Sequence, residues 1–206
     1  YWLLLSSSFI YSQNSEPIQA DRPDQTETPA IVPKGMFQVE TGLVFQKNDA
    51  NSSTFSLPST LWKYGVNENF ELRLLTEFVS EAINYTKTSG LNPIYVGFKV
   101  LLTEEKGIVP KTSYIAQIGF SNAASSPYKT AYFAPEFRLV MQHSLSEKLA
   151  FCYNLGAEWD GFSAVPTYIY TAATGYSITK KTGVYFEIFG FIPQQLGWWN
   201  HLFDKQ

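Results

Sequence analysis

The chain has 206 residues, of which 45% are hydrophobic, 17% aromatic and only 16% charged, with a net charge of -3. Soluble domains carry roughly 25% charged residues, so the composition indicates a surface covered in part by something other than water. The balance of charge, with no long Lys/Arg run, excludes nucleic acid as a partner. The single cysteine, Cys152, excludes a disulfide framework and a multi-cysteine metal site.

Residues 1–13 resemble the apolar region and small-residue tail of a secretory signal, and we interpret them as a partial signal peptide. The alternative is a short buried helix or strand. No run of about 20 apolar residues occurs, which excludes a bundle of membrane-spanning helices. An exported chain without such helices is expected in the periplasm, in the outer membrane or outside the cell.

Residues 14–35 are polar and are interrupted by prolines at positions 17, 23, 29 and 33. Proline disfavours helix, so this segment is predicted to be an extended periplasmic N-terminal arm. A domain of a different pattern begins at residue 36.

From residue 36 onward, apolar and polar residues alternate, which is typical of strands with two unlike faces. The clearest case is residues 149–159, a length that suits a tilted strand crossing a bilayer. Pro58 predicts a bulge or kink in the second strand. About nine strands are expected, at 36–46, 54–66, 70–79, 94–103, 113–121, 132–142, 149–159, 165–176 and 184–190.

The connections between these strands alternate in length, as in outer-membrane barrels with short periplasmic turns and longer outer loops. The short links are expected at 67–69, 104–111, 143–147 and 179–183, and the outer ones at 47–53, 80–93, 122–130, 160–164 and 191–203. The first strand is therefore predicted to run outward.

The polar face decides between a membrane barrel and a soluble one. It consists mostly of Gly, Ser, Thr, Gln and Asn with charges of mixed sign, which suits a narrow lumen better than bulk water. An odd number of antiparallel strands does not close neatly, so about three further strands are expected, and the natural product is expected to be longer at both ends. The fold class is thus an all-β, antiparallel up-and-down transmembrane β-barrel, with residues 36–206 supplying about nine of twelve strands.

Several short motifs together resemble the family of bacterial outer-membrane transporters called "MetA-pathway of phenol degradation". They are ADRPDQTETP at 20–29, VPKGMFQVETG at 32–42, YGV at 64–66, FELRL at 70–74, YNLG at 153–156 and YFE at 185–187. The resemblance runs from about residue 20 to residue 203. It implies a barrel in the outer membrane of a Gram-negative bacterium and passage of small molecules, including aromatic or hydrophobic compounds.

If the apolar face meets lipid, charged residues of the opposite face project into the lumen and are candidates for a solute pathway. Two strands carry the same Glu-x-Arg step, which places both charges on one strand face, where they can form charge-assisted hydrogen bonds. The alternative is that these charges pair only to fill a plugged interior. The candidates are Glu40, Glu71, Arg73, Glu77, Lys99, Glu136, Arg138, Glu158 and Glu187.

Acidic and basic residues also occur in the arm, at Asp21, Arg22 and Asp24. They predict a plug or strap that reaches Arg73 or Arg138; a solvated leader is the alternative.

No spacing of residues indicates catalysis, a metal site or a cofactor, because His143 and His201 are isolated. The expected partners are outer-membrane lipid and a small-molecule solute. A passive pore is the leading hypothesis. The alternatives are a plugged barrel that anchors partner proteins and a secreted, soluble lipid-binding barrel.

Overall fold

The computed structural model describes residues 21, 25–49, 52–83, 86–179 and 182–193. The predicted signal peptide, Arg22, Asp24 and His201 lie outside these residues. Within the described part the chain is a single antiparallel sheet with two short 3-10 turns, η1 (Ser121–Ala123) and η2 (Ser126–Tyr128). No helix among the described residues is long and apolar enough to cross a membrane.

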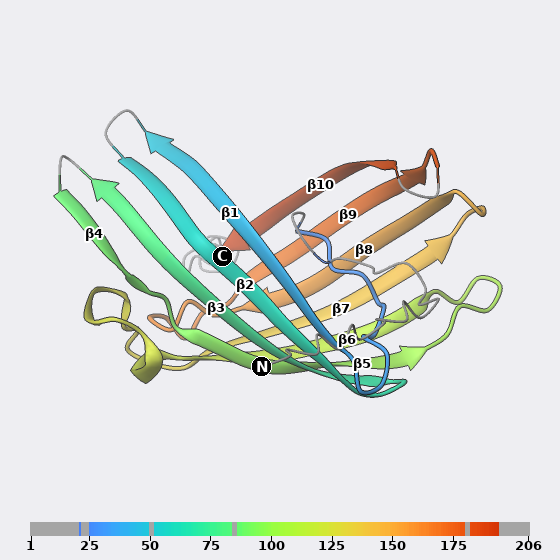
Figure 1. Cartoon of the computed structure of the whole chain (residues 1–206), viewed down its shortest axis with the longest axis horizontal. Coiled ribbons are helices and arrows are strands. Elements are labelled where there is room, and N and C mark those ends of the chain that lie inside the picture. The colour runs from blue at the N-terminus through green and yellow to red at the C-terminus, as the bar shows by residue number, and fades with distance from the viewer. Residues whose placement is uncertain (1–20, 22–24, 50–51, 84–85, 180–181, 194–206) are drawn as a thin grey trace, which may run out of the picture.

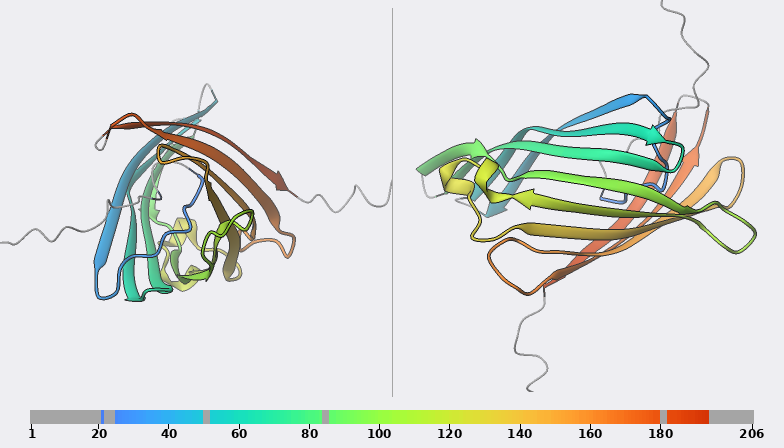
Figure 2. Two further views of the ribbon diagram at one scale, coloured as in Figure 1. Left: turned by 90° about the vertical axis from the view of Figure 1, so that its right-hand side faces the viewer. Right: turned by 90° about the horizontal axis from the view of Figure 1, so that it is seen from below.

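The sheet has ten strands in up-and-down order, and it curls into an incomplete ring (Figures 1 and 2). Each strand pairs with its neighbour in the chain, except that β5 follows β3 in the sheet and β4 pairs only with β3. The strands are β1 (Phe37–Asp49), β2 (Ser52–Asn67), β3 (Phe70–Ile83), β4 (Thr86–Leu91), β5 (Ile94–Thr103), β6 (Lys111–Phe120), β7 (Ala134–Ser144), β8 (Leu149–Glu158), β9 (Thr167–Ser177) and β10 (Gly183–Pro193).

The predicted fold class, an antiparallel all-β sheet of the barrel type, is confirmed. Strand β5 has the predicted bounds, and the other strands differ mainly at their ends. The expected bulge near Pro58 is also present, because the pairing of β2 with β3 shifts register between Ser56 and Ser59. In the described residues β1 and β10 lie at the two edges of the sheet and do not pair with each other.

Two of the predicted outer loops are instead paired strand. The β1–β2 hairpin continues through most of 47–53, and β3 continues to Ile83 and pairs with the unpredicted strand β4. Residues 80–91 are rich in Ser and Thr and lack apolar alternation. Their pairing rests on backbone hydrogen bonds beyond the main body of the sheet. The alternation of apolar and polar side chains does not reveal strands in such a region.

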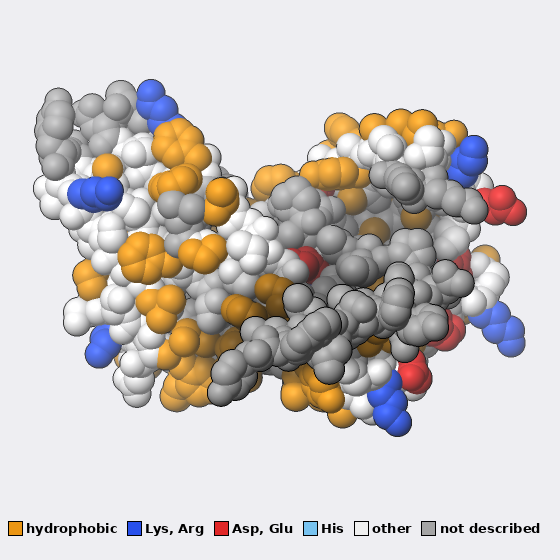
Figure 3. Space-filling view, viewed as in Figure 1, with side chains coloured by type: hydrophobic (Ala, Val, Ile, Leu, Met, Phe, Trp, Pro, Cys, Tyr) orange, Lys and Arg blue, Asp and Glu red, His pale blue; other side chains and the backbone are white. Residues whose placement is uncertain are grey.

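The two faces of the sheet differ in chemistry. Large apolar side chains on the outside of the curl are exposed, among them Phe45, Leu72 and Phe186, whose exposed fractions are 69%, 48% and 72%. Figure 3 shows such side chains over the strands at the left and along the upper edge at β10. The inner face instead buries polar and charged residues, including Glu71, Lys99 and Asn154. The sheet is therefore apolar outside and polar inside.

The described part of the N-terminal arm lies inside the curl (Figure 2). It leaves the interior beside the end of β2, where Lys34 forms a parallel bridge with Gly65 and the Gly35 amide donates to the Gly65 carbonyl at 2.7 Å. A side chain at position 65 would not fit, since a Cβ there would lie 2.2 Å from the carbonyl oxygens of Val32 and Pro33. Glycine is required here because the arm backbone approaches so closely.

Replacement of Gly65 by alanine is expected to push the arm away from β2, because the added methyl group overlaps two arm carbonyl oxygens. Trypsin cleavage after Lys34 should then become several-fold faster than in the unmodified protein, as the bridge that shields this bond is lost. Gly175→Ala is the matched control, since a Cβ at position 175 meets nothing within 4 Å. Equal cleavage rates for the two variants would show that this contact does not hold the arm.

Candidate functional site

All nine predicted lumen residues occupy the inner face of the sheet, in alternation with the exposed apolar side chains. The structure gathers them into separate groups along the lumen. Glu40, Glu71, Arg73, Lys99 and Glu187 contact the arm or lie around it, Glu136, Arg138 and Glu158 lie together on β7 and β8, and Glu77 lies further along β3.

Asp21 of the arm lies at the centre of the first group. Its Oδ2 is 2.8 Å from Lys63 Nζ, 3.0 Å from Lys99 Nζ and 3.5 Å from Arg73 Nη1. Its Oδ1 accepts hydrogen bonds of 2.9 Å from both the amide and the hydroxyl of Thr28. One arm carboxylate therefore meets three basic groups from three different strands.

Glu27 makes the second ionic contact of the arm. Its two carboxylate oxygens accept from Arg73 Nη2 at 2.7 and 2.9 Å. Its backbone is fixed on the opposite wall, because its amide donates to Asn154 Oδ1 at 2.7 Å and its carbonyl accepts from Asn154 Nδ2 at 2.9 Å. A fully buried asparagine thus replaces both hydrogen bonds that a neighbouring strand would give this residue.

Further backbone groups of the arm bond to side chains of the wall, since buried polar groups need hydrogen-bond partners. The Val32 amide donates to Glu71 Oε2 at 2.8 Å, and Ser113 Oγ donates to the Pro29 carbonyl at 2.7 Å. Lys99 Nζ donates to the Thr28 carbonyl at 2.9 Å. An extended, proline-containing segment lies in the lumen without a strand partner because charged and polar side chains take the place of one.

The arm also connects the two edges of the sheet. At β1, Glu40 accepts from the Asp21 amide at 2.9 Å. At β10, Glu187 Oε1 accepts from the amide and hydroxyl of Thr26, both at 2.6 Å, and from the Gln25 amide at 3.0 Å. A segment of six residues therefore links strands that do not pair with each other in the described part of the chain.

The second charged group lies on β7 and β8. Arg138 pairs with Glu136, and its Nη1 donates to the Gln25 carbonyl of the arm at 3.0 Å. Glu136 also accepts from Gln117 Nε2 at 2.6 Å, and it stands directly opposite Glu158 in the register of β7 with β8. Two carboxylates face each other beside one guanidinium, which pairs with Glu136, so this side of the lumen is acidic.

The lumen charges described above, with Lys63 and the arm residues, comprise eight carboxylates and four basic groups, an excess of four negative charges. The carboxylates are Asp21, Glu27, Glu40, Glu71, Glu77, Glu136, Glu158 and Glu187, and the bases are Lys63, Arg73, Lys99 and Arg138. Without Asp21 and Glu27 the excess falls to two. In the described residues, no group of three or more His, Cys, Asp or Glu side chains could hold a metal ion.

The ionisation of Asp21 follows from these contacts. Burial by itself raises the pKa of this carboxyl group, but the positive charges of Lys99, Lys63 and Arg73 outweigh burial and hold the pKa well below its usual range. A lowered pKa means that the ionic contacts are fully present above the ordinary range of an aspartate and are lost only as the pH falls through the lowered value. The arm is therefore held by charge at neutral and mildly acidic pH.

Sequence reasoning missed Lys63 and Asn154, and it included Glu27 only as the last residue of the predicted plug or strap. Lys63 lies on β2 beyond the bulge at residues 56–59, and the shifted alternation hid the face on which it projects. Its inward direction follows once the bulge is counted as one extra residue. Glu27 and Asn154 gave no local signal, since their roles depend on a contact across 127 positions.

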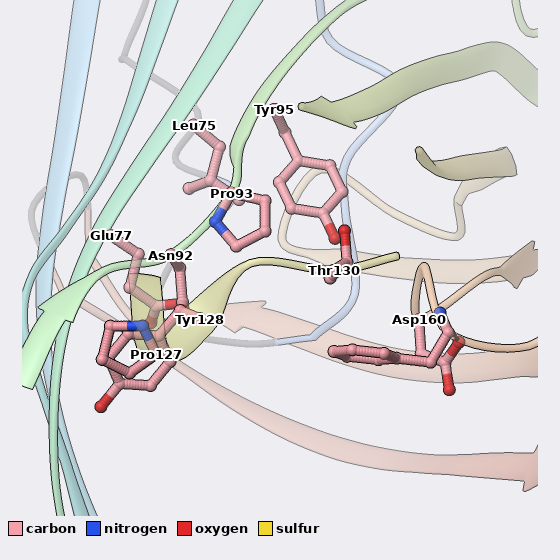
Figure 4. A pocket seen from close by; sticks show the side chains of 10 residues that line it. Leu75, Glu77, Asn92, Pro93, Tyr95, Pro127, Tyr128, Thr130 and Asp160 are labelled. Carbon is pink, nitrogen blue, oxygen red and sulfur yellow. Dashed lines mark hydrogen bonds between the residues drawn. The ribbon is translucent and has the colours of Figure 1, made fainter. Parts of the chain in front are cut away.

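A cavity of about 350 Å³ opens at the end of the lumen opposite the short turns, and we call it the loop-end cavity (Figure 4). Its walls come from β3, from the start of β5 and from the two connections 121–133 and 159–166. The lining residues are Leu75, Glu77, Asn92, Pro93, Tyr95, Pro127, Tyr128, Thr130, Asp160 and Phe162.

The fold and the lumen together define a class: a β-barrel-type protein with an apolar outer face and an interior that holds its own N-terminal arm. A sequence model of the family described as "Putative MetA-pathway of phenol degradation" matches residues 20–196, and the chain belongs to this family. The resemblance seen in the sequence is thereby confirmed. No curated protein and no solved structure matches the chain.

Replacement of Lys99 by methionine is expected to destabilise the protein by roughly 3–5 kcal/mol, because it removes one partner of a buried charge cluster and leaves Asp21 under-compensated. Lys99 is fully buried and contacts Asp21, Glu27 and Glu71. Urea unfolding of the protein in detergent micelles measures the change. The control is Lys111→Met, which breaks a rim pair with Glu104 at 3.2 Å and should cost about 0–1 kcal/mol. Similar losses in both variants would contradict a special role for the cluster.

Proposed function

We propose that the protein is an outer-membrane β-barrel for passive passage of small molecules and that its N-terminal arm occupies and controls the lumen. The observation that carries this proposal is the pairing of an apolar outer face with a charged interior held together by the arm. In water such a sheet would be reversed, with its apolar face inside. The outward Phe45 and Phe186, exposed by 69% and 72%, suit contact with lipid.

The backbone arrangement also suits a bilayer. Antiparallel neighbours satisfy each other's amides and carbonyls, which is a condition for strands at membrane depth. The same condition applies to the outer edges of β1 and β10, which do not pair with each other in the described residues. The short connections lie at the end where the arm leaves the lumen, and the usual rule for outer-membrane barrels supports a periplasmic position for that end.

Two features of the lumen indicate the class of solute. The excess of negative charge favours cations and neutral compounds over anions, since a ring of acidic side chains selects for cations. The inward positions of β10, on the same face as Glu187, carry the aromatic residues Tyr185, Phe189 and Phe191, whose exposed fractions are 55%, 52% and 43%. Apolar rings beside a polar pathway suit aromatic or hydrophobic compounds. We propose no catalytic role, because passage needs no reacting side chain.

A second candidate function is a plugged barrel that anchors partner proteins. The number of contacts that hold the arm favours it, since Asp21, Thr26 and Glu27 are each fixed by several hydrogen bonds or ion pairs. Copurification of a stoichiometric partner would support this function. The secreted soluble barrel predicts a protein that stays in solution without detergent, and the apolar outer face opposes it.

Planar-bilayer conductance tests the passage function. The unmodified protein is expected to show small, cation-selective currents in a KCl gradient. The double variant Asp21→Asn, Glu27→Gln should conduct several-fold more, because the arm loses its ion pairs with Lys63, Lys99 and Arg73. Its cation selectivity should fall, as the lumen loses two negative charges.

The control is Glu104→Gln, which removes an exposed carboxylate at the rim. It should change neither the conductance nor the cation selectivity. If neither the folded protein nor the double variant conducts, the passage function is rejected. The plugged barrel that anchors partner proteins is then the remaining function. Anion selectivity in the unmodified protein would reject the assignment of the solute class.

A further inference from the structure

The loop-end cavity is built by segments that are fixed to one another rather than by loose loops. Ser125 exchanges two hydrogen bonds of 2.9 Å with Leu91, one through its amide and one through its hydroxyl oxygen. Tyr128 donates its hydroxyl to the Thr88 carbonyl at 3.2 Å, and the Tyr132 amide donates to the Gly161 carbonyl at 2.8 Å. The cavity walls are therefore pre-formed, which lowers the cost of binding a ligand.

Aromatic rings line this cavity from three segments. Tyr95 comes from β5, Tyr128 from η2 and Phe162 from the connection between β8 and β9, and the Tyr95 hydroxyl points toward Thr130 (Figure 4). Space for the Tyr95 ring exists because position 119 is glycine, where a Cβ would lie 2.8 Å from the ring. Such rings present faces of negative potential, which attract organic cations.

The charged groups of the cavity have one sign. Glu77 and Asp160 contribute carboxylates, and none of the ten lining residues is basic. Glu77 accepts from Asn92 Nδ2 at 2.9 Å, and Asp160 accepts from the amides of Phe162 and Ser163 at 2.7 and 2.8 Å. The hydrogen bonds from the Phe162 and Ser163 amides lower the pKa of the Asp160 carboxyl group.

We propose that the loop-end cavity binds small organic ammonium ions, which the carboxylates of Glu77 and Asp160 attract from two sides of the cavity, with an apolar or aromatic body against Tyr95, Tyr128 and Phe162. A volume of about 350 Å³ is at the small end of the range for ligand pockets and suits a ligand of one ring. Lys129 is exposed next to Tyr128 in the sequence, but it is not among the lining residues.

This inference goes beyond passage through the lumen. The cavity lies at one end of it and is formed by residues that do not contact the arm in any hydrogen bond or ion pair described above. Binding can be measured directly and does not require the lumen to conduct. Failure of the passage function would therefore leave this site intact, and failure of binding would leave the passage function intact.

The experiment uses three probes of similar shape and different charge: benzylammonium, benzyl alcohol and benzoate. Isothermal titration calorimetry with the protein in neutral detergent micelles measures each affinity. Benzylammonium should bind about tenfold more tightly than benzyl alcohol, because the ammonium group adds an ion pair and a cation–π contact. Benzoate should bind least. The preference for benzylammonium should weaken as salt is raised.

Substitutions of the two acidic lining residues test whether benzylammonium binds in the cavity. Glu77→Gln and Asp160→Asn should each lower the affinity for benzylammonium about threefold to fivefold, and Glu104→Gln at the opposite rim should not change it. Asp160 is exposed, and asparagine keeps an oxygen that can accept from the Phe162 and Ser163 amides, so Asp160→Asn is expected to fold. Equal affinities for the three probes, or an unchanged affinity in a folded double variant of Glu77 and Asp160, would overturn the proposal.

Discussion

A single buried carboxylate organises the interior of this protein. Asp21 meets Lys63, Arg73 and Lys99, which three different strands bring into the lumen. Burying a charge is costly unless it is paired and hydrogen-bonded, so arm and wall are stable in this arrangement only together. The position of the arm and the hydrogen bonds of its backbone depend on this cluster.

The sequence allowed most of the sheet to be predicted, because a strand's two faces follow from alternation alone. The inward direction of Glu71, Arg73 and Lys99 could be read directly from the pattern. Lys63 could not, since the bulge near Pro58 moves its strand out of phase. The pairing of the arm with Asn154 and Glu187 was also beyond reach, because it depends on how the curled sheet brings β8 and β10 to face residues 25–27.

The lumen changes character along its length. Around the arm, charges of both signs are buried and paired, and motion of any one group disturbs several others. Toward the loop-end cavity, carboxylates outnumber bases, aromatic rings replace lysines, and side chains such as Phe162 are exposed. One region is therefore suited to holding a segment of the chain itself, and the other to meeting molecules that arrive from outside.

The link that the arm makes between β1 and β10 limits how far apart these two edge strands can lie. Asp21 and Thr26 are five residues apart, and an extended chain spans at most about 3.3–3.6 Å per residue, which gives roughly 17 Å between the points where the arm meets Glu40 and Glu187. Neighbouring strands are about 4.8 Å apart. The arm therefore limits the separation of β1 and β10 to about the span of five residues plus the lengths of the Glu40 and Glu187 side chains.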